Sequence, residues 1–141
     1  MATFNKIHQF VEDAMHGVHN FSSHQIVVAL TAAANPPLAT NSVLADLTQI
    51  AYTNLSGRSV IIASSGQTTG TYLLVLTDLV LTASGGPVAT FRYVVHYNDT
   101  PTAPADPLIQ WYDHGGDVTL ADGETFTINY QTAPNGFFTL A

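Results

Sequence analysis

Charged residues are scarce in this sequence. They make up 9% of the chain, whereas hydrophobic residues make up 46%; an average soluble domain is about a quarter charged. The solvent-facing positions must therefore be occupied largely by Thr, Ser, Asn, Gln and small apolar residues. A surface of this kind is poorly hydrated, and it is suited to burial against other copies of the chain or against a partner.

Cysteine is absent. Its absence excludes thiol catalysis, thiolate metal sites and a disulfide framework. A chain of 141 residues is long enough to bury roughly two thirds of its unfolded surface without such cross-links. We therefore expect a single domain, residues 1–141, that needs no disulfide for stability.

Basic residues are almost absent as well. The chain has three basic residues, Lys6, Arg58 and Arg92, and ten acidic ones, so its formal net charge is −7. Binding to nucleic acid depends on a basic patch that displaces counterions, and an anionic membrane attracts the same kind of patch. We therefore expect neither nucleic acid nor a membrane as a partner.

Long apolar runs are missing too. The longest runs, such as residues 72–76, are far shorter than the roughly 20 residues that a membrane span requires. The N-terminus lacks the uninterrupted apolar segment of a secretion signal. We expect a protein that is made in the cytoplasm and is not exported by a visible signal.

The first twenty residues carry a helical pattern. Apolar residues recur at steps of three and four, with Thr3 as a fair N-cap. The apolar positions are Phe4, Ile7, Phe10, Val11, Ala14, Met15 and Val18. The pattern predicts one amphipathic helix over residues 1–20, which covers an open face or end of the β domain.

Residues 24–141 have the pattern of β structure, because short branched or aromatic stretches alternate with Gly, Pro and Asn. Strands are predicted at 25–30, 58–63, 71–82, 89–97, 108–112 and 137–140, with a hairpin of 118–120 and 124–130 around Asp122-Gly123. Turns are predicted at 64–70, 84–87 and 115–117. This spacing predicts a mainly β fold: an antiparallel β-sandwich or jelly-roll-like domain with one N-terminal amphipathic α-helix.

Histidines gather on the predicted helix. His8, Glu12, His16 and His19 fall within one sector at about 100° per residue. Such a set either holds a divalent metal or forms the polar boundary of the apolar face, and we favour the boundary. A pH-sensitive subunit contact is a further possibility, because histidine titrates near neutrality.

Acidic residues gather near the C-terminal turns. Asp113, Asp117, Asp122 and Glu124 supply the oxygens that calcium prefers. Two of them stand beside glycine, where aspartate is expected for backbone reasons, so we favour a role in turns. No catalytic constellation or cofactor motif stands out, and the sequence predicts no enzyme, no cofactor and no metal.

Aromatic residues give the best indication of a small-ligand surface. Trp111 and Tyr112 are neighbours on a strand, so they point to opposite faces of the sheet. One is expected in the core, and the other, near Asp113 and His114, could stack on a sugar ring. The alternative, which we favour, is that these rings cap the sandwich with their polar ends in water.

Several stretches together resemble small virion proteins of tailed bacteriophages, of the capsid decoration or cement type. The stretches are residues 4–12 with His19-Asn20, residues 43–50, residues 91–95 with 97–101, and residues 118–126. The resemblance implies a structural protein on the capsid exterior, assembled in the host cytoplasm. It also implies a homo-oligomer, a trimer, that clamps the major capsid protein.

On this basis we expect the chain to decorate and stabilise a capsid, with Phe4, Phe10 and Met15 at the subunit or capsid interface. A module that binds host-surface glycans is one alternative, with Trp111, Tyr112 and His114 as its ligand-binding surface. A structural component of the tail or baseplate is another, and it shares the same composition.

Overall fold

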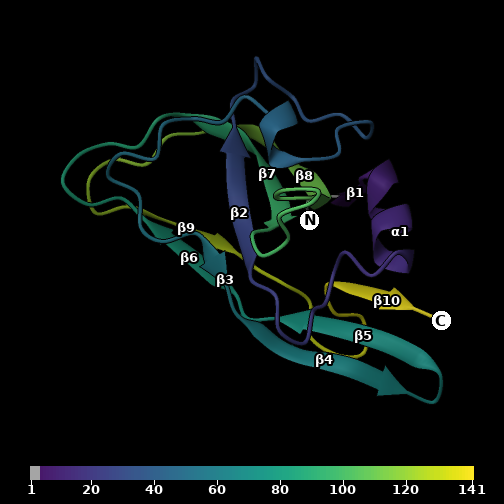
Figure 1. The fold of residues 1–141 in the computed structure, drawn as a ribbon. Helices are drawn as coiled ribbons and strands as arrows, with labels where there is room; N and C mark the ends of the chain where they lie inside the picture. The colour runs from purple at the N-terminus through teal and green to yellow at the C-terminus, as the bar shows by residue number, and fades with distance from the viewer. Residues whose placement is uncertain (1–3) are drawn as a thin grey trace.

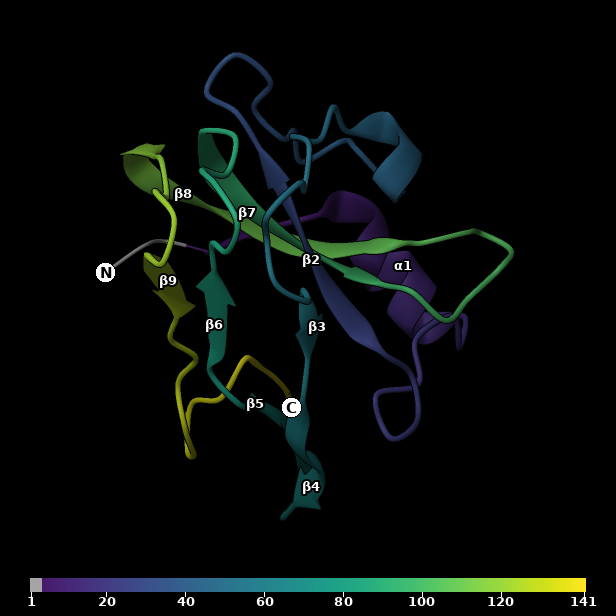
Figure 2. The ribbon, with the colours of Figure 1, turned by 90° about the vertical axis from the view of Figure 1, so that its left-hand side faces the viewer.

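A five-stranded antiparallel sheet forms the centre of the molecule, and two smaller sheets pack against one of its faces (Figure 1, Figure 2). The computed structural model describes residues 4–141. The central sheet has the order β1 (Phe4–Lys6), β8 (Leu108–Val118), β7 (Phe91–Asn98), β2 (Ile26–Thr31) and β3 (Ser59–Val60). The fold is mainly β and antiparallel with one α-helix, as the sequence predicts, and its strands form separate sheets that do not close into a barrel.

The smaller sheets have three and two strands. The first has the order β10 (Phe138–Leu140), β5 (Thr71–Leu76) and β4 (Ile62–Thr68), and the second pairs β6 (Leu79–Thr82) with β9 (Thr125–Ile128). The helix α1 (His8–Met15) and a 3-10 turn, η1 (Leu44–Asp46), complete the elements.

The central sheet is buried on both of its faces. On β2, Val28 and Leu30 point into the larger core, which the smaller sheets close with residues such as Leu81. Val27 and Ala29 point to the opposite face, into a smaller cluster. Burial on both sides explains why β2 is a continuous apolar run rather than an alternating one.

The predicted N-terminal helix is shorter than expected, because Phe4–Lys6 is a strand. Phe4 lies opposite Tyr112, so β1 extends the central sheet beside β8. The helix begins at His8, after Ile7 as its N-cap residue; the predicted cap, Thr3, lies outside the described residues. Three residues of strand are too few for their apolar spacing to be distinguished from helical spacing.

Gly17 ends the helix early. Its φ is +75°, a conformation that glycine adopts without a steric penalty. The backbone N–H groups of Val18 and Gly17 donate to the carbonyl oxygens of Asp13 and Ala14, at 2.9 and 3.4 Å. This is a Schellman motif, and it explains why the predicted last turn is absent.

Two predicted elements of the β domain are divided differently in the structure. The predicted turn at 64–70 is mostly strand β4, and the chain reverses only at Thr69-Gly70, where φ is +50° and +84°. The predicted strand at 71–82 breaks between β5 and β6. There the Asp78 carboxylate accepts a hydrogen bond of 2.7 Å from the Tyr130 N–H.

The predicted turn at 115–117 and the predicted hairpin are also wrong. Strand β8 runs on to Val118, and its register with β7 shifts where Gly115 has a φ of +91°. Strand β9 pairs with β6, and not with residues 118–120. The tight turn at Asp122-Gly123 is present. It leads into β9, but β9 then pairs with β6, which is distant in the sequence.

Candidate functional site

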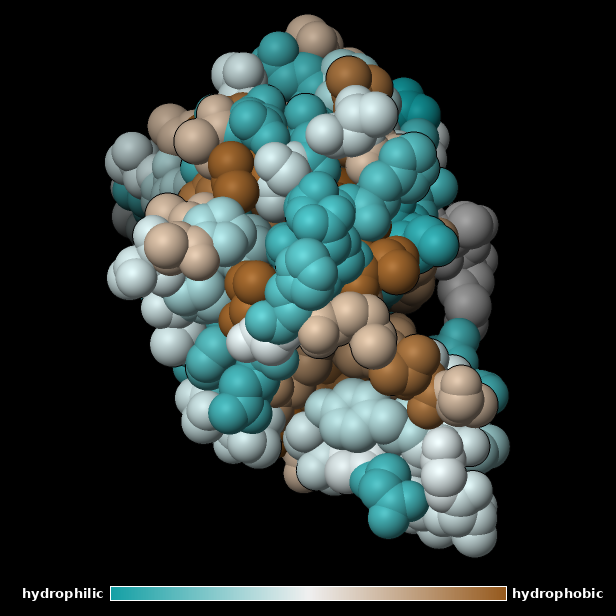
Figure 3. Space-filling view, turned by 45° about the vertical axis from the view of Figure 1, so that its right-hand side comes forward, coloured by the Kyte–Doolittle hydropathy of each residue, from teal (hydrophilic) through white to brown (hydrophobic). Residues whose placement is uncertain are grey.

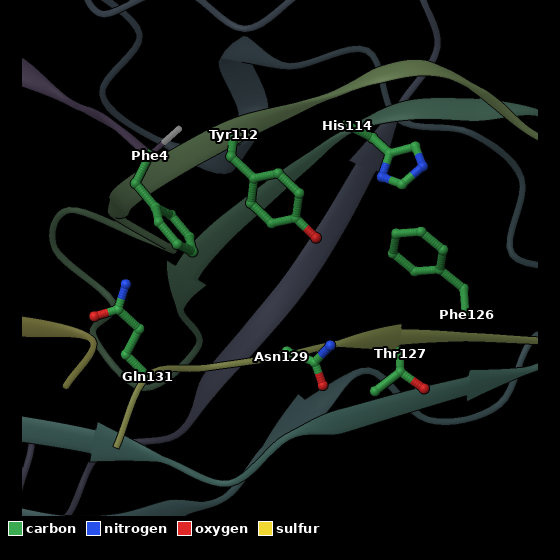
Figure 4. Close-up of a pocket in the computed structure, with 7 residues that line it drawn as sticks. All are labelled: Phe4, Tyr112, His114, Phe126, Thr127, Asn129 and Gln131. Carbon is green, nitrogen blue, oxygen red and sulfur yellow. The ribbon is translucent and has the colours of Figure 1, made fainter. Parts of the chain in front are cut away.

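A cavity of about 380 Å³ opens between the central sheet and β9 (Figure 4). Strands β1 and β8 provide one wall, and β9 with the residues after it provides the other. The lining residues are Phe4, Tyr112, His114, Phe126, Thr127, Asn129 and Gln131. None of the seven is Lys, Arg, Asp or Glu, so the cavity is suited to an uncharged ligand.

Aromatic rings from β1 and β8 line one wall of the cavity, and Phe126 adds a ring from β9. The ring of Phe4 meets that of Tyr112 edge to face, with centroids 5.1 Å apart. His114 and Phe126 form a second edge-to-face pair, also at 5.1 Å. Such rings offer flat apolar surfaces that pack on a ligand, and both pairs have the geometry that aromatic quadrupoles favour.

Polar side chains follow Phe126 along the wall made by β9 and the residues after it. Thr127, Asn129 and Gln131 line the cavity, whereas the residues between them, Ile128 and Tyr130, are buried in the core. This alternation is that of an extended chain with one buried face. A hydroxyl and two amides, which both donate and accept hydrogen bonds, are thereby aligned along one wall.

The core behind the cavity is aromatic and keeps its polar groups neutral. The Tyr130 hydroxyl and the His96 Nε2 atom are 2.6 Å apart. Burial lowers the pKa of His96 to about 3, so the imidazole is neutral at ordinary pH. Burial also raises the pKa of Tyr112 from its ordinary value of 10.0 to about 12, so its hydroxyl is protonated over a wider range of pH than that of an exposed tyrosine.

The structure brings together two of the three residues predicted for a ligand surface. Tyr112 and His114 line the cavity, whereas Trp111 points to the opposite face of the sheet, where its ring meets Tyr93 edge to face at 6.0 Å. Asp113, also expected nearby, is held by Arg92 at 2.8 and 3.0 Å. This bidentate contact lowers the pKa of the Asp113 carboxyl.

The polar wall is the part that the sequence reasoning missed. The signal was present as alternation in residues 126–131, where polar residues occupy every second position after Phe126. That alternation predicts which side chains share a face, but it does not predict that the face lies opposite β8. The position of Phe4 could not be predicted from a helical interpretation of residues 1–20.

A second candidate site is an apolar surface on α1 and β10, which we call the α1–β10 surface. It consists of Phe10, Val11, Met15, Phe138 and Leu140. Val11, Met15 and Leu140 are 50%, 74% and 56% exposed. They border a groove of about 260 Å³, and Figure 3 shows apolar side chains gathered around a hollow on this side of the molecule.

The three residues predicted for an interface lie in different parts of the structure. Met15 is at the α1–β10 surface and is highly exposed. Phe10 lines the same groove, but its ring also packs edge to face on Phe138 at 5.5 Å. Phe4 lies on β1 in the wall of the cavity and does not line this groove. The three side chains therefore do not form one surface.

The predicted histidine stripe is only partly present. His16 lies 3.6 Å from Glu12 on exposed helix surface. His19 lies beyond the end of α1 and is stacked on Phe21 at 5.3 Å. Its Nδ1 atom accepts a hydrogen bond from the Asn98 amide, which also donates to His24. Burial lowers the pKa of His19 to about 4.

Asp122 and Glu124, two of the four acidic residues predicted near the turns, act as hydrogen-bond acceptors for the backbone. The Asp122 carboxylate accepts from the Gly85 N–H at 2.9 Å, and the Glu124 carboxylate accepts from the Ala121 N–H at 2.8 Å. Asp113 is instead paired with Arg92. Within residues 4–141, no group of three or more His, Cys, Asp or Glu side chains is arranged to hold a metal ion.

None of the helices in the described part of the chain is long and apolar enough to cross a membrane. Comparisons of the chain with protein-family models, with curated proteins and with solved structures find no match.

Proposed function

We propose that this chain is a structural virion protein that decorates a tailed-phage capsid, binding its outer surface through the α1–β10 surface. The observation that carries the proposal is the exposure of Val11, Met15 and Leu140 side by side around an apolar groove. Contiguous exposed apolar patches on soluble proteins mark sites of interaction. The resemblance of four sequence stretches to capsid decoration proteins supplies the partner.

The energetics of such an interface favour a charge-poor chain. Burying a charge between subunits incurs a desolvation penalty of several kcal/mol per ion. Only 9% of this chain is charged, and Lys6 is the one charged residue that lines the α1–β10 groove. Apolar contact therefore adds cohesion between capsid subunits with little opposing desolvation, which is how a decoration protein resists outward strain.

The first experiment is sedimentation of the protein with phage heads that lack it. Co-sedimentation at a fixed, saturable ratio to the major capsid protein is the expected result, and the ratio identifies the symmetry of the sites. A protein that stays in the supernatant contradicts the proposal and favours a tail or baseplate component.

Point substitutions test the surface more cleanly than removal of residues 1–20. That deletion would remove β1 and the fully buried Ile7. We expect the double variant Val11→Lys/Met15→Lys to weaken binding to heads by tenfold or more, which corresponds to about 1.4 kcal/mol. Leu38→Lys/Val80→Lys is the matched control, because both of its positions are exposed apolar residues outside the surface. Equal binding by both variants contradicts the assignment.

A second candidate function, recognition of a neutral sugar, is favoured by the lining of the cavity. Sugars present apolar C–H faces that pack on aromatic rings and hydroxyl groups that pair with amides. Tyr112 and Phe126 provide rings, and Asn129 provides an amide. Because Trp111 lies on the opposite face, a substitution at Trp111 is not expected to affect this site.

Saturation-transfer NMR with host-surface polysaccharide tests the second candidate. The expected result is transfer to sugar protons that is lost in Asn129→Ala and kept in Gln67→Ala, which removes an exposed amide outside the cavity. Absence of transfer to the polysaccharide with the unmodified protein, or equal transfer with both variants, contradicts a sugar site in the cavity.

A further inference from the structure

Strand β4 is an unprotected sheet edge. It lies at the end of the three-stranded sheet, with β5 on one side and no strand of residues 4–141 on the other. Its seven residues make it the longest edge strand in the described chain, since β1, β3, β6, β9 and β10 have three, two, four, four and three. With β5 it forms a hairpin that projects from the body of the molecule in two views (Figure 1, Figure 2).

The edge lacks the features that normally prevent strand pairing. Proteins protect long edges with charged side chains, proline, bulges or covering segments. Residues 62–68 include no charged residue and no proline, and all but Ile62 and Ser65 are exposed. A register shift disturbs β4 only between Ile62 and Ser64, which leaves residues 64–68 regular.

An apolar residue is exposed at the start of this edge. Ile61 is 69% exposed, although it is one of the larger aliphatic side chains of the chain. It directly precedes β4, so this edge presents exposed apolar surface beside its unpaired main-chain groups. Main-chain hydrogen bonds are the interaction that strand addition uses.

We infer that β4 pairs with β4 of a second copy of this chain, antiparallel across a twofold axis at Gly66. Ser64 then faces Thr68 of the partner subunit, and two three-stranded sheets join into one of six strands. The net charge of −7 opposes contact between copies of the chain, so two copies meet where the facing residues are uncharged. Residues 62–68 carry no charge, and no register between two copies of them places like charges in opposition.

This inference deepens the proposed function, because it names the surface by which the decoration protein forms its oligomer, and it rests on that proposal for its biological role. A twofold contact is isologous, which is the commonest symmetry of soluble oligomers. It differs from the trimer that the sequence resemblance implies. The α1–β10 surface is not part of β4 and stays available for the capsid.

Sedimentation velocity of the purified chain, without heads, tests the pairing. We expect a dimer for the unmodified protein. Ser64→Lys/Thr68→Lys and Ser64→Glu/Thr68→Glu are each expected to be monomeric, because like charges then face each other across the twofold axis. Mixing the two variants is expected to restore a dimer that contains one copy of each.

The control for the lysine variant is Ala33→Lys/Ala34→Lys, which adds the same charge at two exposed positions of the loop between β2 and η1. This control is expected to remain dimeric. A monomeric or trimeric unmodified protein overturns the inference, and so does a charge pair at 64 and 68 that leaves the dimer intact. Binding to heads is measured separately, so a monomer that co-sediments with heads overturns the β4 pairing and leaves the proposed function standing.

Discussion

Strands β2 and β4 show how differently two parts of this molecule are built. All six residues of β2 are buried, whereas no residue of β4 is. Strand β2 lies between two paired neighbours and two apolar clusters, and β4 has a single neighbour and faces solvent. The difference indicates that stability is concentrated in the central sheet, while the surfaces left for partners lie on the outer elements.

The largest effect that would test this comparison is loss of a core side chain. Leu30 is fully buried on β2, and Leu30→Ala is expected to lower the free energy of unfolding by about 2–5 kcal/mol, because it removes apolar contacts and leaves a cavity. Ile61→Ala, at an exposed aliphatic position beside β4, is expected to change it by less than about 0.5 kcal/mol. Urea unfolding of a monomeric background measures both, and similar losses would contradict the comparison.

The same contrast explains which elements could be predicted from the sequence. The apolar run of β2 and the pattern of β7 are recognisable locally, because burial dictates their residue types. The sequence predicts helix at Phe4–Lys6, which is a strand, because three residues carry no distinctive period. The predicted partner of β9 is wrong, because an Asp-Gly turn predicts a local hairpin. The actual partner, β6, lies more than forty residues earlier in the sequence.

The candidate sites were less predictable than the strands. The cavity joins Phe4, Tyr112 and Phe126, which are distant in the sequence and come together only through the order β1-β8 and the packing of β9. Alternation on β8 correctly placed Trp111 and Tyr112 on opposite faces. The alternation does not predict which of the two faces borders the cavity, because that depends on which other elements pack against each face of the sheet.

Acid pH is expected to have the next largest effect on stability. Burial lowers the pKa of His19 to about 4 and that of His96 to about 3, against about 6.5 in an unfolded chain. The unfolded state therefore binds more protons below pH 6.5, so stability is full above that pH and falls as the pH drops toward 4 and then 3. Unfolding by urea at a series of pH values measures this slope.

Variants test the contribution of His96 in that experiment. His96→Gln removes this fully buried imidazole, so its stability is expected to depend less steeply on pH, whatever its absolute stability. Gln67→Ala, which changes an exposed side chain that does not titrate, is expected to keep the slope of the unmodified protein. Equal slopes for all three proteins would show that the His96 imidazole does not link folding to pH.

The prediction with the smallest expected change in stability compares two hydrogen bonds of equal length. The Tyr130 hydroxyl lies 2.6 Å from His96 in the core, and the Tyr72 hydroxyl lies 2.6 Å from Ser65 beside the β4 edge. Tyr130→Phe leaves the buried Nε2 atom of His96 without that partner, and loss of a buried partner is expected to destabilise by about 1–3 kcal/mol.

Tyr72→Phe is the matched comparison, because water can replace the lost hydroxyl at the partly exposed pair on β4 and β5. We expect a change of less than about 0.5 kcal/mol there, measured by thermal unfolding of both variants. Since the two bonds have the same length, any difference in cost comes from their surroundings. If Tyr72→Phe proved as costly as Tyr130→Phe, the β4–β5 hairpin would be as much a part of the stable core as the central sheet, and its edge would be a poorer candidate for a contact surface.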